Sequence, residues 1–100
     1  MPEIFSFDLE DREDEHLVRL RGELDVLNAS RLRDALIEVG HSRVVVDLSD
    51  VSFIDSSGMA SLLGARQAIT DAGNQFVVRG ATGIVRRVIE LTGLGEVLGA

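Results

Sequence analysis

The stretch from Val44 to Gly58, VVVDLSDVSFIDSSG, constrains the fold of this chain more than any other. It opens with three β-branched residues, Val44 to Val46, and a short apolar run without alternation is typical of a strand covered on both faces, as in a sheet with helices above and below. Polar residues interrupt the run from Ser49 onward, while apolar residues recur among them and anchor the connection. An apolar pattern at helical spacing begins directly after Gly58. The stretch therefore predicts a strand, a fixed loop and a helix N-terminus.

Two hydroxyl groups, those of Ser56 and Ser57, lie at the predicted start of this helix, directly after Asp55. The backbone N–H groups of a first helical turn lack intrahelical partners, and the aligned peptide dipoles place partial positive charge there. Asp55 or Ser56 can accept one of these N–H groups as an N-cap, which is the simplest interpretation. A phosphate attached to Ser56 or Ser57 would meet the same donors and the same field. The residues alone are compatible with an ordinary cap and with a phosphorylation site.

Composition limits the chain to a small acidic domain. Its 100 residues, 45% of them hydrophobic, are expected to form one domain, residues 1–100, around a single modest core. The formal net charge of −7 argues against nucleic acid or an anionic membrane surface as the partner. The N-terminus has no secretory signal pattern, and no apolar run approaches the roughly 20 residues that span a bilayer. We therefore expect a cytoplasmic protein with no nucleic-acid or membrane partner.

The rest of the sequence predicts a hairpin, further strands and helices. Alternating apolar residues predict an antiparallel hairpin with a charged turn, formed by residues 4–9, 11–15 and 17–21. Helical spacing predicts helices over residues 28–39, 56–72 and 82–91, and apolar runs predict strands over 76–78 and 96–98. Strand–helix–strand connections between parallel strands are right-handed in nearly all proteins. The predicted class is α/β: a mixed sheet of four to five strands with an N-terminal β-hairpin and about three helices.

The helices carry finer expectations. Asn28 or Ser30 is expected to cap the first helix, and Gly40 to end it. The second helix has a flank of small residues, which predicts either close packing against a neighbour or a shallow exposed surface: Ala60, Ser61, Gly64 and Ala68. Thr82 is expected to cap the third helix. The residues of this helix expected to face inward are the apolar Ile84, Val85, Val88, Ile89 and Leu91. Those expected to face outward are the charged Arg86, Arg87 and Glu90.

Enzyme chemistry is poorly supported. The two histidines, His16 and His41, have no neighbours at metal-ligand spacing, and the acidic turn does not resemble a calcium loop. Ser56 as a hydrolase nucleophile would need a positioned base, and both the G-x-S-x-G motif and a phosphate-binding P-loop are absent. We expect no enzyme activity, no catalytic residue, no cofactor and no metal.

Three motifs together resemble one known family. The run Asp47–Ser49 followed by Val51–Gly58 is similar to the signature of the STAS domain family, and in particular to the stand-alone bacterial anti-sigma factor antagonists. Gly22–Asp25 and Leu91–Leu94 match two further family motifs, in the family's order across nearly the whole chain. The resemblance implies a STAS-like fold. Family members commonly continue with a further strand and a closing helix, whereas this sequence ends at Ala100.

The resemblance also implies a regulatory mechanism. In that family the serine directly after the aspartate, which is Ser56 by position, is phosphorylated by the anti-sigma factor, a serine kinase. The unphosphorylated domain is expected to bind this kinase and thereby free the sigma factor. Phosphorylation at Ser56 is expected to end binding, and a PP2C-type serine phosphatase is expected to restore it. Met59 is expected to lie mostly in the core, with part of it exposed. The implied partner-binding residues are Asp25, Asp55, Ser56, Ser57, Gly58 and Met59.

Two alternatives remain open. STAS domains also act as adaptor subunits of transport complexes or stress-sensing assemblies, without a phosphorylation switch. The Asp55-Ser56 pair and the free-standing length favour the antagonist over the adaptor. A nucleotide or lipid held by the loops near Asp25 and Ser56 is a third possibility, although no residue specifies one.

Overall fold

The protein folds into a four-stranded mixed sheet with three helices, as seen in a computed structural model that describes residues 5–39, 42–93 and 95. The elements follow the order β1 (Ser6–Asp11), β2 (His16–Leu24), α1 (Ala29–Val39), β3 (Arg43–Ile54), α2 (Ser56–Asp71), β4 (Gln75–Arg79) and α3 (Gly83–Thr92). The sheet order is β1-β2-β3-β4, with β1 antiparallel to β2 and the other neighbours parallel. The predicted α/β class, hairpin and helix number are confirmed.

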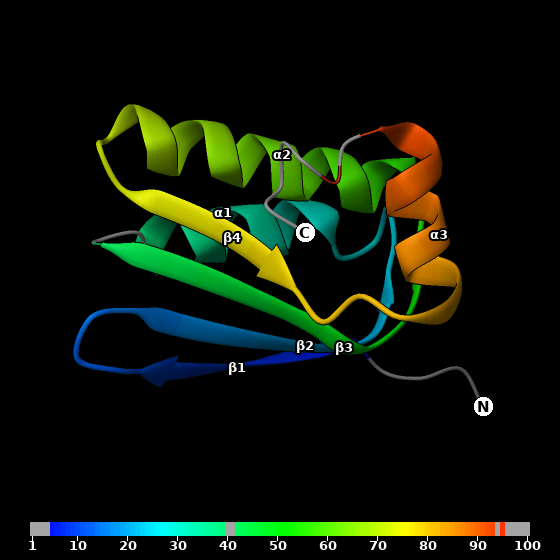
Figure 1. The fold of residues 1–100 in the computed structure, drawn as a ribbon, viewed down its shortest axis with the longest axis horizontal. Coiled ribbons are helices and arrows are strands. Elements are labelled where there is room, and N and C mark those ends of the chain that lie inside the picture. Colours follow the sequence, from blue (N-terminus) through cyan, green and yellow to red (C-terminus); the bar gives the residue numbers. More distant parts are fainter. Residues whose placement is uncertain (1–4, 40–41, 94, 96–100) are drawn as a thin grey trace.

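Helices α1 and α2 lie along one side of the sheet, and α3 stands at its end (Figure 1). Right-handed β2-α1-β3 and β3-α2-β4 connections in a sheet of this order place both helices on the same face. Their apolar sides and that face of the sheet form one core, which includes Leu32, Leu36, Leu62, Val44 and Val46. The valine run predicted helices on both faces of the sheet. Within the described ranges the helices cover one face only, so this prediction is wrong.

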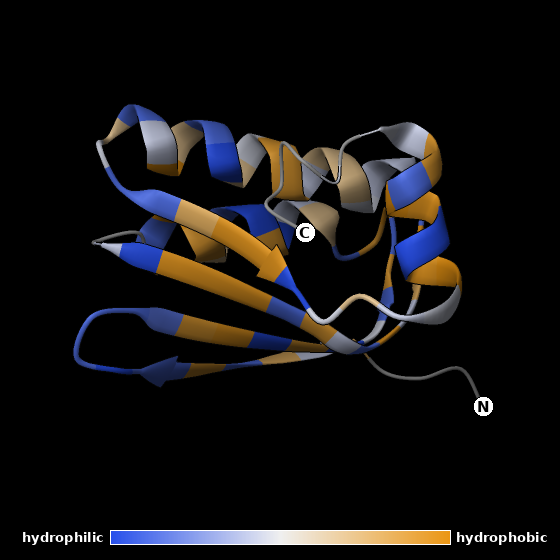
Figure 2. Ribbon diagram, viewed as in Figure 1, coloured by the Kyte–Doolittle hydropathy of each residue, from blue (hydrophilic) through white to orange (hydrophobic). Residues whose placement is uncertain are grey.

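Val45 is nevertheless buried, although it points to the face opposite the helices. Its neighbours in the strand register are Leu17 on β2 and Val77 on β4, so an apolar row crosses the centre of this face. Figure 2 shows the central strands as largely hydrophobic bands, whereas the turn between β1 and β2 is hydrophilic. The unbroken valine run thus reflects burial on both faces, with helices responsible for only one of them.

Both central strands are longer than the sequence predicts. Strand β3 continues from Leu48 through the predicted loop to Ile54, and β2 includes Gly22 to Leu24. Two irregularities in the β2–β3 register, between Arg19 and Arg21 and between Gly22 and Glu23, accommodate the extension. Such bulges change which side chains face the core, so the polar residues of this part of β3 do not need strict alternation. The predicted loop is therefore wrong.

Helix α3 faces the core with only part of its apolar surface. Val85 and Ile89 are buried, but Ile84 is 55% exposed and Leu91 is 74% exposed, so the expectation that these two face inward is wrong. Thr82 occupies the N-cap position, although its side chain makes no capping hydrogen bond. Gly93 ends the helix in the left-handed conformation at φ 72°, which glycine adopts readily.

Helix α1 packs against the small flank of α2. A Cβ at Gly64 would lie 3.2 Å from the Arg33 Cδ atom, and Ser61 is buried. Close packing is therefore confirmed for this part of the flank, whereas Ala60 is exposed. The predicted last strand at 96–98 and the predicted helix end at Gly40 fall outside the described residues, as does His41.

Neither a membrane span nor a metal cluster is found in the part of the chain that the structure describes. None of the described helices combines the length and the apolar character needed to cross a membrane. The same residues contain no group of three or more His, Cys, Asp or Glu side chains arranged to hold a metal ion.

Candidate functional site at the start of helix α2

The two sequence motifs around Leu24 and Asp55 meet at one corner of the molecule. Strands β2 and β3 are parallel, so their carboxyl ends lie side by side, and Leu24 pairs with Ile54 in the register. The Asp55 N–H donates a hydrogen bond to the Leu24 carbonyl oxygen at 3.3 Å. The chain then turns directly into α2 (Figure 1). The motif at Gly22–Asp25 and the run that ends at Gly58 therefore lie next to each other in the fold.

Asp55 caps helix α2. Its backbone is extended, at φ −110° and ψ −173°, and its Oδ1 atom accepts a hydrogen bond from the Gly58 N–H at 2.9 Å. The Asp55 carbonyl oxygen accepts the first helical hydrogen bond, from the Met59 N–H at 3.0 Å. A capping carboxylate satisfies one of the unpaired donors and is stabilised by the helix dipole. The first turn is therefore fixed by the side chain that precedes Ser56.

Gly58 lets α2 approach the end of β2. A Cβ atom added there would lie 2.5 Å from the Leu24 carbonyl oxygen and 2.8 Å from the Ile54 Cγ1 atom. Both neighbours belong to the central strands, so neither can move without disturbing the sheet. A glycine is required at this position because of the close approach, and the helix start is clamped against the strands.

The two adjacent hydroxyls differ in access. Ser56 is exposed, whereas Ser57 is half-buried. Ser61, one turn later, is buried and donates a hydrogen bond from its Oγ atom to the Gly58 carbonyl oxygen at 2.6 Å. Ser56 is therefore the more accessible of the two hydroxyls, on a backbone held by the cap and by the contact at Gly58.

Asp25 fixes the neighbouring turn between β2 and α1. Its Oδ1 atom accepts hydrogen bonds from the Leu27 N–H at 3.0 Å and from the Asn28 Nδ2 atom at 3.2 Å. Asn28 Nδ2 also donates to the Glu23 carbonyl oxygen at 3.0 Å, so the Asn28 amide braces the turn as a donor. The turn presents Val26 and Leu27 to solvent, with Leu27 87% exposed. Asp25 thus acts on its own loop rather than on Ser56.

Met59 is a core residue. It is 4% exposed and belongs to the main hydrophobic cluster, so the expectation that part of it is exposed is wrong. Gly58 is buried as well. Of the six predicted partner-binding residues, these two support the shape of the corner, while Asp25, Asp55, Ser56 and Ser57 have exposed or half-buried side chains.

Two depressions flank the start of α2. The depression between α1 and α2, about 220 Å³, is lined by Val26, Ala29, Ser30, Arg33, Ser57, Ala60 and Ser61. The depression between α2 and α3, about 410 Å³, is lined by Asp55, Ser56, Met59, Ala60, Leu63, Val88 and Thr92. The two serines therefore face different depressions, Ser57 the first and Ser56 the second.

Sequence reasoning missed the apolar side chains around these depressions. The signal for Val26 and Leu27 was present, since two apolar residues stand between the GELD motif and the helix start, outside any core-facing pattern. The signal on α3 was the width of its apolar surface, which exceeds what Val85 and Ile89 need to reach the core.

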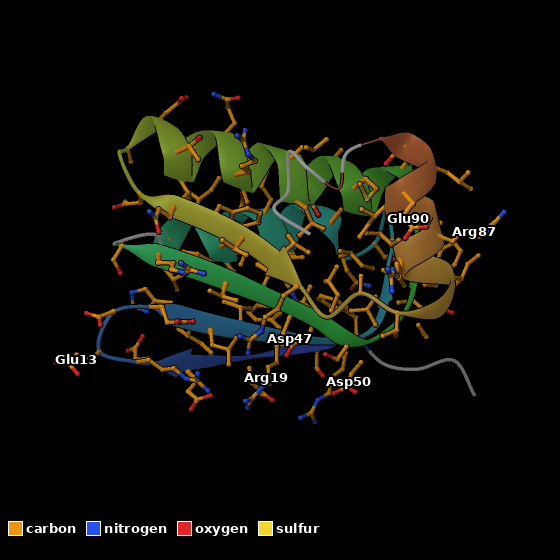
Figure 3. All side chains as sticks on the ribbon, viewed as in Figure 1. Glu13, Arg19, Asp47, Asp50, Arg87 and Glu90 are labelled. Atoms are coloured by element: carbon orange, nitrogen blue, oxygen red, sulfur yellow. The ribbon has the colours of Figure 1, made fainter. Side chains whose placement is uncertain are left out.

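The arginines of α3 do not line either depression. Arg86 pairs with Glu90 on the same helix, with its Nε atom 3.0 Å from the Glu90 Oε1 atom, and it lines a separate hollow with Arg79 and Gly80. Arg87 is exposed and extends away from the body of the molecule (Figure 3). The interpretation of both residues as a solvated face fits this arrangement.

A larger depression of about 580 Å³ lies away from the Ser56 corner, at the edge of the sheet face opposite the helices. Arg21, one of its lining residues, lies 3.6 Å from the Asp8 carboxylate and 3.9 Å from the Asp50 carboxylate. Figure 3 shows Arg19, Asp47 and Asp50 on this face. Its charges are already matched by ion pairs, so volume alone does not make it the functional site.

Asp47 is the one described carboxyl group on this face with a clearly shifted pKa. Partial burial on its own would raise that pKa, but hydrogen bonds from the Ser49 hydroxyl and N–H act in the opposite direction. The positive charges of Arg79 and Arg19 lower the pKa further. The net effect holds the pKa of Asp47 below its ordinary value, so this carboxylate is a charged part of the sheet face.

Comparison with known proteins agrees with this architecture. A family model described as "Mlab, STAS domain" matches residues 7–99. An anti-sigma-B factor antagonist from Listeria monocytogenes is 28% identical over 97 residues, which cover 93% of this chain and 85% of the relative.

Solved structures give the same result. An anti-sigma factor antagonist from Mycobacterium paratuberculosis has a TM-score of 0.80 at 28% identity, with 98% of this chain and 86% of that chain covered. The anti-sigma factor antagonist SpoIIAA, in its unphosphorylated form, has a TM-score of 0.78 at 25% identity, with 91% and 84% covered. The Bacillus SpoIIAA structure in the phosphorylated form has a TM-score of 0.70 at 26% identity, with 91% and 86% covered. Because the family model spans most of the chain and these structures share its fold, the chain belongs to the STAS domain family.

Proposed function

We propose that the protein is an anti-sigma factor antagonist of the cytoplasm, controlled by phosphorylation at Ser56. The observation that carries the proposal is the exposed Ser56 hydroxyl, held on a capped and clamped helix start beside an apolar depression. The relatives add support, because the Listeria protein is named an anti-sigma-B factor antagonist and SpoIIAA has been solved in unphosphorylated and phosphorylated forms. The unphosphorylated protein binds an anti-sigma factor serine kinase, which then releases its sigma factor.

The kinase ends this complex by phosphoryl transfer. The Ser56 Oγ atom attacks the γ-phosphorus of ATP, a bond forms between Oγ and phosphorus, and the bond from phosphorus to the bridging β–γ oxygen breaks to leave ADP. The hydroxyl proton passes to a base on the kinase. The protein supplies a nucleophile in a fixed position, and positioning accounts for much of the catalysis in such reactions.

Added charge is the physical basis of release. A phosphoserine carries about −1.5 to −2 charges near neutral pH, on a chain with a formal net charge of −7. The N-terminus of α2 stabilises an anion, so the phosphate leaves the fold intact. A kinase surface that accepted the neutral hydroxyl then meets a hydrated dianion beside Asp55. A PP2C-type serine phosphatase restores the binding form by hydrolysis.

The other site residues have supporting roles in this proposal. Asp55 and Asp25 hold the two turns that the kinase contacts, and their carboxylates favour a basic partner surface. Ser57 faces the other depression and contributes contact area rather than phosphate. Gly58 and Met59 act through packing, because both are buried.

Phosphate mapping tests the proposal. The protein is incubated with ATP and each purified anti-sigma factor kinase of its source organism, and phosphopeptides are located by mass spectrometry. We expect one phosphate, on Ser56, and none in the Ser56→Ala variant. Phosphate on Ser57, or on neither serine with any kinase, would refute the assignment. Stable co-purification of the native protein with a transporter or an oligomeric sensor instead would favour the adaptor role.

A further inference from the structure

Helix α3 carries more apolar surface than the core uses. Residues in a helix are about 100° apart, so Ile84, Val88 and Leu91 form one stripe along its side. Val85 and Ile89 lie on the adjoining side and are buried. Within the stripe, Val88 is half-buried, while Ile84 and Leu91 are more than half exposed. The charged residues of α3 occupy the remaining surface.

This stripe continues into the depression beside Ser56. Val88 contributes to one wall of that depression, and Leu63 and Ala60 contribute to the wall from α2. Ser56 and Asp55 line the same space of about 410 Å³. Single exposed apolar residues are ordinary on a protein surface. The three stripe residues, by contrast, are at helical spacing and adjoin the depression that Ser56 lines. Stripe and depression therefore form one continuous surface.

The charges around this surface limit its occupant. Asp55 is the one charged side chain among the residues that line the depression, so a basic group of the partner fits at this end. Beside the stripe the charges differ, since Arg86 pairs with Glu90 and the exposed Arg87 adds a positive charge. A second copy of the chain would bring two net charges of −7 together and place two such carboxylates near each other. An apolar segment with Lys or Arg at the Asp55 end therefore fits the surface better than a second copy of the chain does.

We propose that the Ile84–Val88–Leu91 stripe and the adjoining depression bind an amphipathic helix of the anti-sigma factor kinase, in an inference that rests on the function proposed above. Helix-in-groove recognition uses apolar side chains at positions i, i+3 or i+4, and i+7, which matches a stripe of this length. A basic residue of the partner helix lies against Asp55. The stripe anchors the kinase in the orientation that brings its ATP to Ser56.

The proposal also explains how one phosphate ends binding. A phosphate on Ser56 lies at the depression and needs its hydration shell, whereas an apolar helix in the depression would remove that water. Burying an incompletely paired charge is costly, so phosphate and helix exclude each other. The effect of charge at Ser56 should therefore depend on the apolar contact made by α3.

The experiment measures dissociation constants for purified anti-sigma factor kinase, with ADP in place of ATP so that no phosphoryl transfer takes place. Leu91→Ser and Ile84→Ser remove stripe contacts, and Ile37→Ser, an exposed apolar position on α1, is the matched control. We expect each stripe variant to weaken binding by about fivefold or more, and the control by less than about twofold. All three positions are exposed, and urea unfolding verifies that stability is retained.

Two further variants make the test specific. Leu27→Ser probes the depression on the α1 side, and its loss of binding together with unchanged binding by both stripe variants would overturn the inference. Combining Leu91→Ser with Ser56→Asp forms a double-mutant cycle. We expect Ser56→Asp to weaken binding less in the Leu91→Ser background than in the wild type. Equal effects in both backgrounds would contradict mutual exclusion.

Failure of the inference and failure of the proposed function give different results. If the wild type binds the kinase and is released on phosphorylation, yet both stripe variants bind as tightly as the wild type, only the α3 docking site is wrong. If the wild type binds and is phosphorylated by no anti-sigma factor kinase, the proposed function and the inference fall together. A concentration-dependent dimer in sedimentation, dispersed by Leu91→Ser, would assign the stripe to self-association and overturn the inference.

Discussion

Gly58 shows how a single residue couples the sheet to the candidate site at the start of α2. Its missing side chain lets the first turn of α2 lie against the Leu24 carbonyl oxygen, the same atom that accepts the Asp55 N–H. The position of Ser56 is thereby set by the ends of β2 and β3. Rigid placement of the hydroxyl follows from backbone packing and needs no contact by the hydroxyl itself.

We predict that Gly58→Ala destabilises the protein by about 1–3 kcal/mol, because the added Cβ meets strand backbone that cannot yield. Gly64→Ala is the matched control on the same helix, where the new Cβ meets only the flexible Arg33 side chain. Alanine has the higher helix propensity, so the control should be within about 1 kcal/mol of wild type. Urea unfolding followed by circular dichroism measures both. Equal stability of the two variants would show that the clamp at Gly58 is absent.

At the scale of an element, strand β3 joins two chemically different halves. Its first half contains the buried valines Val44 to Val46. Its second half begins where the Ser49 N–H donates a hydrogen bond to the Asp47 carboxylate, and it ends just before Asp55. The lowered pKa of Asp47 means that the folded state prefers the carboxylate. Such a group stabilises the fold fully above its unfolded pKa and loses this contribution as the pH falls through the folded pKa.

We therefore predict that acid weakens the wild type partly through Asp47, at pH values below its ordinary pKa of 3.8. Asp47→Asn should lower stability at neutral pH by about 0.5–2 kcal/mol and reduce the loss on acidification. Asp50→Asn, an exposed position on the same face, controls for the change in net charge. Urea unfolding at neutral and acid pH measures the difference. An unchanged acid dependence in Asp47→Asn would exclude this role.

At the scale of the whole molecule, hydrophobic periodicity predicted the helices and strands, and the motifs indicated the residues of the candidate site. The valine run, the helical spacing after Gly58 and the hairpin pattern depend on local burial, which side-chain type reports directly. The length of β3 was missed because register irregularities let Ser49 to Phe53 stay in the sheet without alternation. Such irregularities depend on the partner strand, which a local pattern does not contain.

The site was predicted in part for a similar reason. A cap at Asp55 or Ser56 follows from chemistry at a helix start, which is local, and the structure has Asp55 in that role. The depressions on either side depend on how α1 and α3 pack against α2, and the exposure of Leu27 and Leu91 depends on what remains uncovered after packing. Sequence patterns identify apolar residues but do not show which of them the fold leaves exposed.

The most direct test of the account is the affinity of the purified anti-sigma factor kinase for two forms of this protein. One is unphosphorylated, and the other carries a stoichiometric phosphate on Ser56; Ser56→Ala serves as a form that cannot be modified. Calorimetry with ADP should give tight binding for the unphosphorylated protein and for Ser56→Ala, and binding weaker by at least about tenfold, or 1.4 kcal/mol, for the phosphoprotein. Equal affinity of the phosphorylated and unphosphorylated forms would contradict the central claim that charge at Ser56 controls recognition.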